Sequence, residues 1–430
     1  MLLALSKKGH SKSSTKAPLP GLSLYLDSSQ DKVFKPNDIV SGRVIIVTPH
    51  IITPQAVEVT LWGESKVWIR TQSSDSNNST DYKHYRDNAP LFAVTSNLLS
   101  GPCQFVPDQS YTFPFSFRIP EGTDFNRNGC YENSNDGRWT VFPHKLPPSF
   151  FFGHQDRPDN CDISYGVNAR LLLSGFGSAD PISSTAPILF QPSNAQALTE
   201  NQLSVIRYPK NFTVQSSALT GIDPKSIGFR QRMHDRISSG TPKMDFELGI
   251  ELPDVLSSGS EFRFRTTFDV LSKGEKVTHI PEITFKVLKL NLLDFTFFRA
   301  PRDWEALNLM SGVHSTRFPK KQRMGFQGQE YNIFREKKTQ LNSLPEFIVM
   351  ELPEVQEEGE KKGMEQAKHC ETWFTARIPG YTPPSFTSFA ISRHYRLIVK
   401  MGVECGGKKF EFETESHVKE LGSAISENGI

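Results

Sequence analysis

The sequence lacks the features that mark several protein classes. Its 430 residues carry 49 basic and 47 acidic side chains, so neither sign of charge dominates, and a strongly basic nucleic-acid binder is excluded as the default. No apolar run approaches the roughly 20 residues of a membrane-spanning helix. The opening apolar run, Met1–Leu5, precedes its lysines, whereas a secretory signal places positive charge first. We therefore expect a cytoplasmic protein that does not bind nucleic acid.

Signatures of metal binding and catalysis are also scarce. The five cysteines are widely spaced without a C-x-x-C pair, which argues against a zinc knuckle or a disulfide framework. The histidines form no H-x-H or H-E-x-x-H pattern, and there is no G-x-S-x-G or phosphate-binding loop. The best metal-like cluster is spaced too loosely for zinc and reads as a surface loop: His154, Asp159, Cys161 and Asp162. We expect no cofactor, no metal and no enzymatic activity.

Aromatic residues are abundant, with 32 Phe, 10 Tyr and 5 Trp, and they follow a period of two. Alternation of this kind is typical of strands with one buried face. It recurs in four segments: 111–119, 163–173, 262–270 and 395–403. Pro114 cannot donate to a sheet and predicts an edge or bulged strand. Short helices are suggested only at 304–311 and 413–422, so the sequence predicts an all-β protein.

An internal repeat divides the chain. Pro147-Pro148-Ser149-Phe150 is followed by Ile163-Ser164 and Tyr165, and Pro383-Pro384-Ser385-Phe386 is followed by Ile391-Ser392 and Tyr395. Two tandem β-sandwiches explain the recurrence of these turns and strands. The expected organisation is a disordered arm at 1–20, a first sandwich at 21–192, a linker at 193–240, a second sandwich at 241–415 with a polar insertion around 300–370, and a tail at 416–430.

Several segments, read in order, resemble an arrestin. Asn37–Val44 followed by Val57–Gly63 resembles the opening strands of an arrestin N-terminal domain. Tyr111–Pro120, then Leu146–Phe150 and Ile163–Tyr165, resemble its later strands. The second copy of the repeat, at 383–405, resembles the arrestin C-terminal domain. The resemblance is nearest to the arrestin-domain (α-arrestin) proteins of fungi, and it implies two immunoglobulin-like sandwiches in tandem.

The resemblance also implies a function. Arrestin-like adaptors bind cytosolic parts of membrane transporters or receptors and couple them to ubiquitin-dependent endocytosis or signalling, with recruitment to the plasma membrane or endosomes. Two alternatives remain open: an arrestin-fold subunit of an endosomal sorting or coat complex, and a secreted carbohydrate-binding sandwich. The missing signal sequence argues against the second alternative.

Candidate binding residues are few. The family recruits ubiquitin ligases through P-P-x-Y or L-P-x-Y motifs that fit WW domains, and only Pro379 and Tyr381 approach this pattern. A buried turn is the favoured interpretation of that segment, so another adaptor is expected to supply the ligase contact. A basic cluster is a candidate for anionic lipid or phosphopeptides, although a solvated insertion is favoured: Arg317, Lys320, Lys321, Arg323, Arg335, Lys337 and Lys338. Gly42 and Gly63 are expected to relieve crowding within strands.

Overall fold

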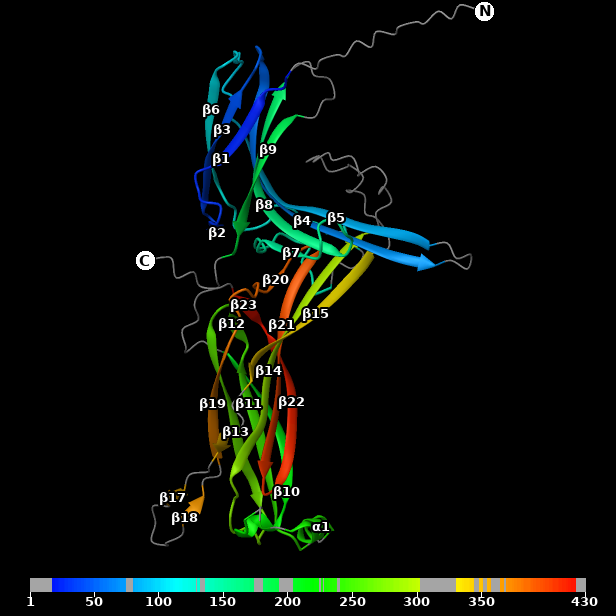
Figure 1. Ribbon diagram of the computed structural model, residues 1–430, viewed down its shortest axis with the longest axis vertical. Coiled ribbons are helices and arrows are strands. Elements are labelled where there is room, and N and C mark those ends of the chain that lie inside the picture. The colour runs from blue at the N-terminus through cyan, green and yellow to red at the C-terminus, as the bar shows by residue number, and fades with distance from the viewer. Residues whose placement is uncertain are drawn as a thin grey trace, which may run out of the picture.

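The structure is a computed structural model in which two elongated β-sandwiches lie end to end (Figure 1). It confirms the predicted all-β class. The residues that it describes are 18–74, 80–128, 130–131, 136–173, 181–192, 204–223, 226, 228–237, 240–301, 330–343, 348–350, 354–356, 364–366 and 369–422. The helix expected at 304–311 lies outside them.

The first sandwich consists of a three-stranded and a six-stranded sheet. The smaller sheet has the order β1-β3-β6, formed by β1 (Gly21–Leu26), β3 (Ile39–Val47) and β6 (Ser110–Arg118). The larger sheet has the order β2-β9-β8-β4-β5, formed by β2 (Val33–Phe34), β9 (Ile182–Phe190), β8 (Asn160–Leu173), β4 (Pro54–Ser74) and β5 (Thr80–Asn97), with β7 (Phe150–Phe152) beside β8. Pro114 lies on β6, so the predicted edge position is confirmed.

The second sandwich repeats this plan. Its four-stranded sheet has the order β10-β11-β13-β19, formed by β10 (Val205–Gln215), β11 (Lys243–Pro253), β13 (Glu261–Lys273) and β19 (His369–Arg377). Its six-stranded sheet has the order β15-β14-β21-β20, formed by β15 (Glu330–Ser343), β14 (Ile283–Pro301), β21 (Ile391–Cys405) and β20 (Phe386–Thr387), with β16 (Ile348–Met350) on β14 and β22 (Lys408–Val418) on β21. Two small sheets complete the fold: β12 (Val255–Ser257) with β23 (Glu420–Gly422), and β17 (Glu354–Gln356) with β18 (Met364–Gln366).

Three segments differ from the sequence-based expectation. The predicted linker contains β10, a 3₁₀ helix at Ser217–Thr220 and the helix α1 (Phe229–Ile237). The predicted insertion contains β15, which pairs with β14. The prediction of a helix at 413–422 is wrong, because this segment forms the end of β22 and then β23. Pairing with β21 and an alternating burial pattern outweigh the helix preference of its glutamates.

The Pro-Pro-Ser-Phe repeats occupy equivalent places in the two sandwiches. The Tyr165 hydroxyl donates to the Pro147 carbonyl at 2.6 Å, and the Tyr395 hydroxyl donates to the Pro383 carbonyl, also at 2.6 Å. Burial raises the pKa of both tyrosines, so each remains a neutral donor. The repeat is therefore a corner in which a core tyrosine holds the turn that precedes its own strand.

The serines of the repeats confirm this equivalence. The N–H of Ser149 donates to the Phe190 carbonyl, and the Ser149 hydroxyl accepts from the N–H of Phe190. Ser385 makes the same pair of bonds with Leu421. Phe190 ends β9 beside the parallel strand β2, and Leu421 lies on β23 beside the parallel strand β12. Strands β1, β2, β3 and β6 thus correspond to β11, β12, β13 and β19.

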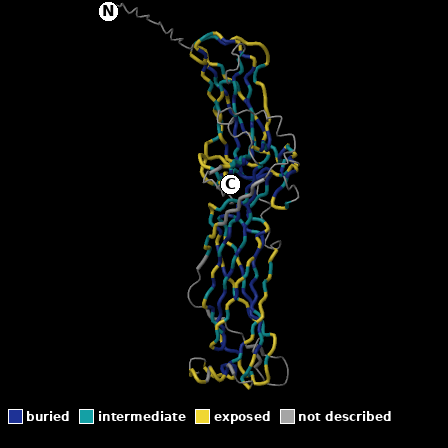
Figure 2. The backbone as a smooth tube through the Cα atoms, turned by 90° about the vertical axis from the view of Figure 1, so that its right-hand side faces the viewer, coloured by how far each residue is buried: buried dark blue, intermediate teal, exposed yellow. Residues whose placement is uncertain are grey.

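The two sandwiches meet through the repeats themselves. The rings of Phe150 and Phe386 form an edge-to-face pair with centroids 5.4 Å apart. Strands β14 and β21, together with the residues between β20 and β21, also reach into the first sandwich, where Phe298, Phe389 and Ile391 are fully buried in its apolar core. Figure 2 shows the buried residues running through the junction. The second half of the chain therefore completes the core of the first half.

Candidate functional site

The two sandwiches differ at one sheet edge. Within the part of the chain that the structure describes, β1 pairs only with β3, so its other edge carries no strand. In the second sandwich the equivalent strand, β11, is covered along its whole length by β10. Among the described strands, the edge of β1 is therefore open where its internal counterpart is occupied.

The strand β10 shows what an added strand contributes at this position. Val214 is fully buried in the second core, and Tyr208 and Phe212 pack partly buried against it. Phe212 contacts the rings of Phe246 and Phe410, with centroids 5.7 and 5.4 Å away. The apolar side chains on one face of β10 thus close this side of the second core.

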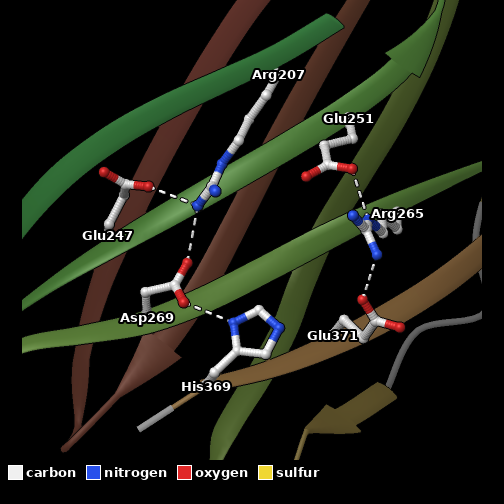
Figure 3. A network of polar contacts seen from close by, with 7 residues as sticks. All are labelled: Arg207, Glu247, Glu251, Arg265, Asp269, His369 and Glu371. Atoms are coloured by element: carbon white, nitrogen blue, oxygen red, sulfur yellow. Dashed lines mark hydrogen bonds and ion pairs between the residues drawn. The ribbon is translucent and has the colours of Figure 1, made fainter. Parts of the chain in front are cut away.

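Polar contacts hold β10 in place on the outer face (Figure 3). Arg207 on β10 donates to Glu247 on β11 at 2.7 Å and to Asp269 on β13 at 2.9 Å. It reaches β13 across Gly249, where a Cβ atom would lie 3.3 Å from the Arg207 guanidinium. Asp269 also contacts the ring of His369 on β19 at 2.5 Å. One arginine and one carboxylate therefore connect four strands.

A second cluster continues across the same face. Arg265 donates to Glu251 and to Glu371 at 2.6 Å each, and its pKa is raised by those hydrogen bonds and charges. The ring centroid of Trp373 lies 5.4 Å from the Arg265 guanidinium and 5.3 Å from that of Arg263. The charges of this face are thus largely paired within it, which fits a solvated surface.

The open edge of β1 presents backbone groups and leucines. The N–H of Asp27 donates to the Ser41 carbonyl, and bonding alternates along an antiparallel pair. The N–H and C=O groups of Leu22, Leu24 and Leu26 therefore point away from β3, toward the open edge. Their side chains are only half-buried against the first core, whereas β10 closes the corresponding side of the second core. This edge can bond an extended segment and bury its apolar side chains.

Comparison with known proteins defines the family character of this sandwich. Residues 22–125, from β1 past β6, match the sequence model of the arrestin (or S-antigen) N-terminal domain. Residues 22–125 therefore form an arrestin-like domain. None of the curated proteins matches it at a significant level.

The predicted WW-binding residues, Pro379 and Tyr381, lie in a tight turn. The N–H of Thr382 donates to the Pro379 carbonyl at 3.0 Å, and the Ser258 hydroxyl donates to Pro379 and Gly380. The expected burial holds for Ile378, which is fully buried, but is wrong for Tyr381, which is 77% exposed. WW domains bind extended polyproline helices, so this bonded turn would have to open first.

The predicted basic cluster is only partly described. Arg317, Lys320, Lys321 and Arg323 lie outside the described residues. Arg335, Lys337 and Lys338 fall on β15, where Lys337 is opposite Asp294 and Lys338 is opposite Leu293. Consecutive residues of a strand face opposite ways, so Lys337 and Lys338 do not form one surface. Among the residues that the structure describes, no helix is long and apolar enough to cross a membrane, and no group of acidic, histidine or cysteine side chains is placed to hold a metal ion.

A buried polar cluster at the junction was not foreseen from the sequence. Asp87 on β5 accepts hydrogen bonds from Arg127 and from the Tyr131 hydroxyl, each at 2.6 Å. Burial alone would lower the pKa of Arg127, but the facing Asp87 and Tyr131 raise it overall. Arg299 on β14 is fully buried with its guanidinium 3.9 Å from the Tyr131 ring centroid, and it donates to the Phe389 carbonyl. The cluster thus joins the two halves of the chain.

We expect His144 to make the junction sensitive to pH. Its Nδ1 lies 2.9 Å from the Phe142 carbonyl, its Nε2 lies 3.1 Å from the Ser388 hydroxyl, and burial lowers its pKa below 6.5. Because the unfolded chain then binds a proton more readily, the free energy of unfolding should fall as pH drops below about 6.5. His144→Gln should reduce this pH slope in urea titrations between pH 7 and pH 5. An unchanged slope would contradict the role assigned to His144. Burial also lowers the pKa of His394, so His394 should supply part of the pH dependence that remains in the variant.

Proposed function

We propose that this protein is a non-enzymatic adaptor that binds cytosolic segments of membrane transporters or receptors along the open edge of β1. The observation that supports this most directly is the internal comparison: β10 fills the equivalent edge of the second sandwich, while none of the described strands covers the edge of β1. Strand addition gives affinity through backbone hydrogen bonds, and pockets for alternate side chains give specificity. The arrestin character of residues 22–125 favours a partner of this class.

The internal counterpart also indicates the chemistry of the ligand. β10 runs antiparallel to β11 and places Tyr208, Phe212 and Val214 toward the core. A ligand segment for β1 should therefore be extended and antiparallel, with apolar residues at alternate positions. It would cover the half-buried Leu22, Leu24 and Leu26.

Coupling to ubiquitin-dependent endocytosis or signalling forms the second part of the proposal. Tyr381 is exposed, but the hydrogen-bonded turn that holds it differs from the extended form that a WW domain binds. We therefore assign ligase recruitment to a partner adaptor and expect the protein to act in the cytoplasm, at the plasma membrane or at endosomes. No covalent chemistry by this chain is required.

The test is to bind extended peptides from cytosolic segments to the purified chain and follow amide hydrogen exchange. The amides of Leu22, Leu24 and Leu26 should become protected, because they donate to the added strand, while those of β10 should not change. Leu24→Pro removes one edge donor without removing a bond to β3 and should weaken binding about tenfold, the effect of roughly one or two hydrogen bonds. Binding that leaves the β1 amides unprotected would disprove this site.

The same variant tests the function in cells. Proximity labelling from the intact protein should mark membrane transporters or receptors together with a ubiquitin ligase, and Leu24→Pro should lose both. Tyr381→Ala should lose neither, because the ligase contact is indirect. Labelling dominated by subunits of a sorting complex, with no ligase, would favour the coat-subunit alternative instead.

A further inference from the structure

The last part of strand β5 is a sheet edge without charge. β5 lies at one end of the strand order in the larger sheet of the first sandwich (Figure 1), and among the described strands it pairs only with β4. No acidic or basic side chain occurs from residue 88 to residue 107, although 22% of the whole chain is charged. Proteins usually place charge or proline on an open edge, which keeps another strand from adding to it. Residues 93–97 of β5 contain neither.

Most other edge strands that the structure describes are protected in the usual way. β15 pairs with β14 as β5 pairs with β4, and it contains five charged residues: Glu330, Arg335, Glu336, Lys337 and Lys338. β22 also contains five: Lys408, Lys409, Glu411, Glu413 and Glu415. The edge of β1 lacks charge as well, and it is the edge to which we assign a peptide ligand. An uncharged edge on β5 therefore calls for a partner too.

The uncharged edge is exposed and firmly held. Five consecutive residues are exposed: Ala93, Val94, Thr95, Ser96 and Asn97. Val94 is 41% exposed although it lies opposite Leu61, which is fully buried on the neighbouring strand. Phe92 is buried just before this segment, and the N–H of Leu98 donates to the Val57 carbonyl at 2.8 Å just after it. The segment is thus an extended strand fixed at both ends.

The hydrogen-bond pattern shows which backbone groups are available. Leu98 and Val57 form a hydrogen-bonded pair, and such pairs alternate along an antiparallel ladder. The N–H and C=O groups that point away from β4 are therefore those of Ala93, Thr95 and Asn97. The N–H of Asp124 donates to the Leu91 carbonyl, which points the same way. Past residue 91, no described backbone group bonds to this edge of β5.

This edge is complementary to a second copy of itself. A two-fold axis through Thr95 would pair two copies in antiparallel orientation, with Thr95 opposite Thr95 and Ala93 opposite Asn97. The outward groups of these three residues would then make roughly six backbone hydrogen bonds between the copies. No charges would meet, and threonine pairs are favourable across strands. The two larger sheets would form one continuous sheet.

We propose that this protein forms a symmetric homodimer by antiparallel pairing of its β5 strands at residues 93–97. The segment offers no charge by which a different partner could be selected, whereas its own sequence already supplies the matching register. The inference does not depend on the proposed function, because β1 belongs to the other sheet of the first sandwich.

Sedimentation velocity of the full chain over a range of concentrations tests the proposal. The mass should rise from 48.5 kDa toward twice that value as the concentration increases. Thr95→Lys and Thr95→Glu should each raise the dissociation constant about tenfold or more, because like charges would lie directly opposite each other on the two-fold axis. An equimolar mixture of the two variants should recover dimers, since a cation then faces an anion. A mixture that stays monomeric would mean that Thr95 does not face its own copy.

A disulfide between copies provides a second measurement. In a chain whose exposed Cys103 is replaced by Ser, Thr95→Cys should form covalent dimers under mild oxidation. Residues in a hydrogen-bonded pair of strands have Cα atoms about 5.5 Å apart, which is within the range of a disulfide. Thr112→Cys, at an exposed position of β6, is the matched control and should stay monomeric. Equal crosslinking at the two positions would contradict the proposed pairing.

Two further variants separate this edge from other surfaces. Thr112→Lys adds the same charge to β6 and should dimerise like the unmodified chain. Leu24→Pro should also dimerise, so a failure of peptide binding at β1 can be told apart from a failure of dimerisation. If the unmodified chain stays monomeric at every concentration, or if Thr95→Lys dimerises equally well, the proposal is wrong.

Discussion

Replacing Asp87 by Ala should lower the free energy of unfolding by about 3–5 kcal/mol, the usual cost of removing one partner from a buried ion pair. The side chains of Asp87 and Arg127 are 1% and 11% exposed. Without the carboxylate, Arg127 keeps its charge in a buried site and the Tyr131 hydroxyl loses its acceptor. Neither group can recover its bond from water without opening the junction.

The effect should extend beyond the first sandwich. Tyr131 stacks beneath Arg299 of β14, and the Arg127 guanidinium lies 5.9 Å from the ring centroid of Phe389. A displaced Arg127 would therefore disturb residues that the second half of the chain contributes to the first core. We expect the two sandwiches to unfold together in the unmodified chain and with less cooperativity in the Asp87 variant.

Urea unfolding monitored by tryptophan fluorescence provides the measurement, since Trp139 lies 4.8 Å from the Arg299 guanidinium. Glu415→Ala is the matched control, because it breaks an ion pair with Arg396 whose side chains are 39% and 43% exposed. Such surface pairs contribute at most about 1 kcal/mol. A loss for Asp87→Ala as small as that for the control would contradict the assigned role of the cluster.

A compensating variant sharpens this test. Replacing Asp87 by Ala and Arg127 by Met together removes both charges and should recover part of the lost stability, because no unpaired cation remains buried. Equal losses for the single and double variants would mean that packing around Asp87, and not its charge, is decisive.

Much of the fold could be predicted because its pattern is local. Alternation of period two identified strands in both halves, and the Pro-Pro-Ser-Phe repeat identified the corners that Tyr165 and Tyr395 close. The strand β10 escaped notice because Pro209 and Lys210 interrupt its alternation, and its pairing with β11 spans the intervening helix. The extent of the second sandwich therefore depended on a long-range contact that no local pattern encodes.

The site was harder to predict for the same reason. An open edge is a property of strand order, and the alternation at Leu22, Leu24 and Leu26 cannot reveal which strand is missing beside them. Asp87, Arg127 and Arg299 come from distant segments, and nothing in their spacing indicates that they meet.

Gly42→Ala should lower the free energy of unfolding by about 2–3 kcal/mol and also impair peptide binding at β1, because an overpacked strand must shift. Gly42 lies on β3 between β1 and β6, paired with Leu26 and Phe115. An added Cβ would stand 2.1 Å from the Tyr25 carbonyl oxygen and 2.7 Å from the Phe115 ring. No rotamer change can relieve a clash with backbone, so β1 itself must move.

Gly21→Ala is the matched control for this prediction. The same added methyl group on β1 would meet only the Val47 carbonyl, at an ordinary 3.7 Å. This variant should keep both its stability and its affinity for extended peptides, measured by urea unfolding and by the β1 amide protection described above. If Gly42→Ala loses stability but binds peptides normally, the ligand does not use the β1 edge, since that edge cannot keep its position when the backbone of Tyr25 is displaced.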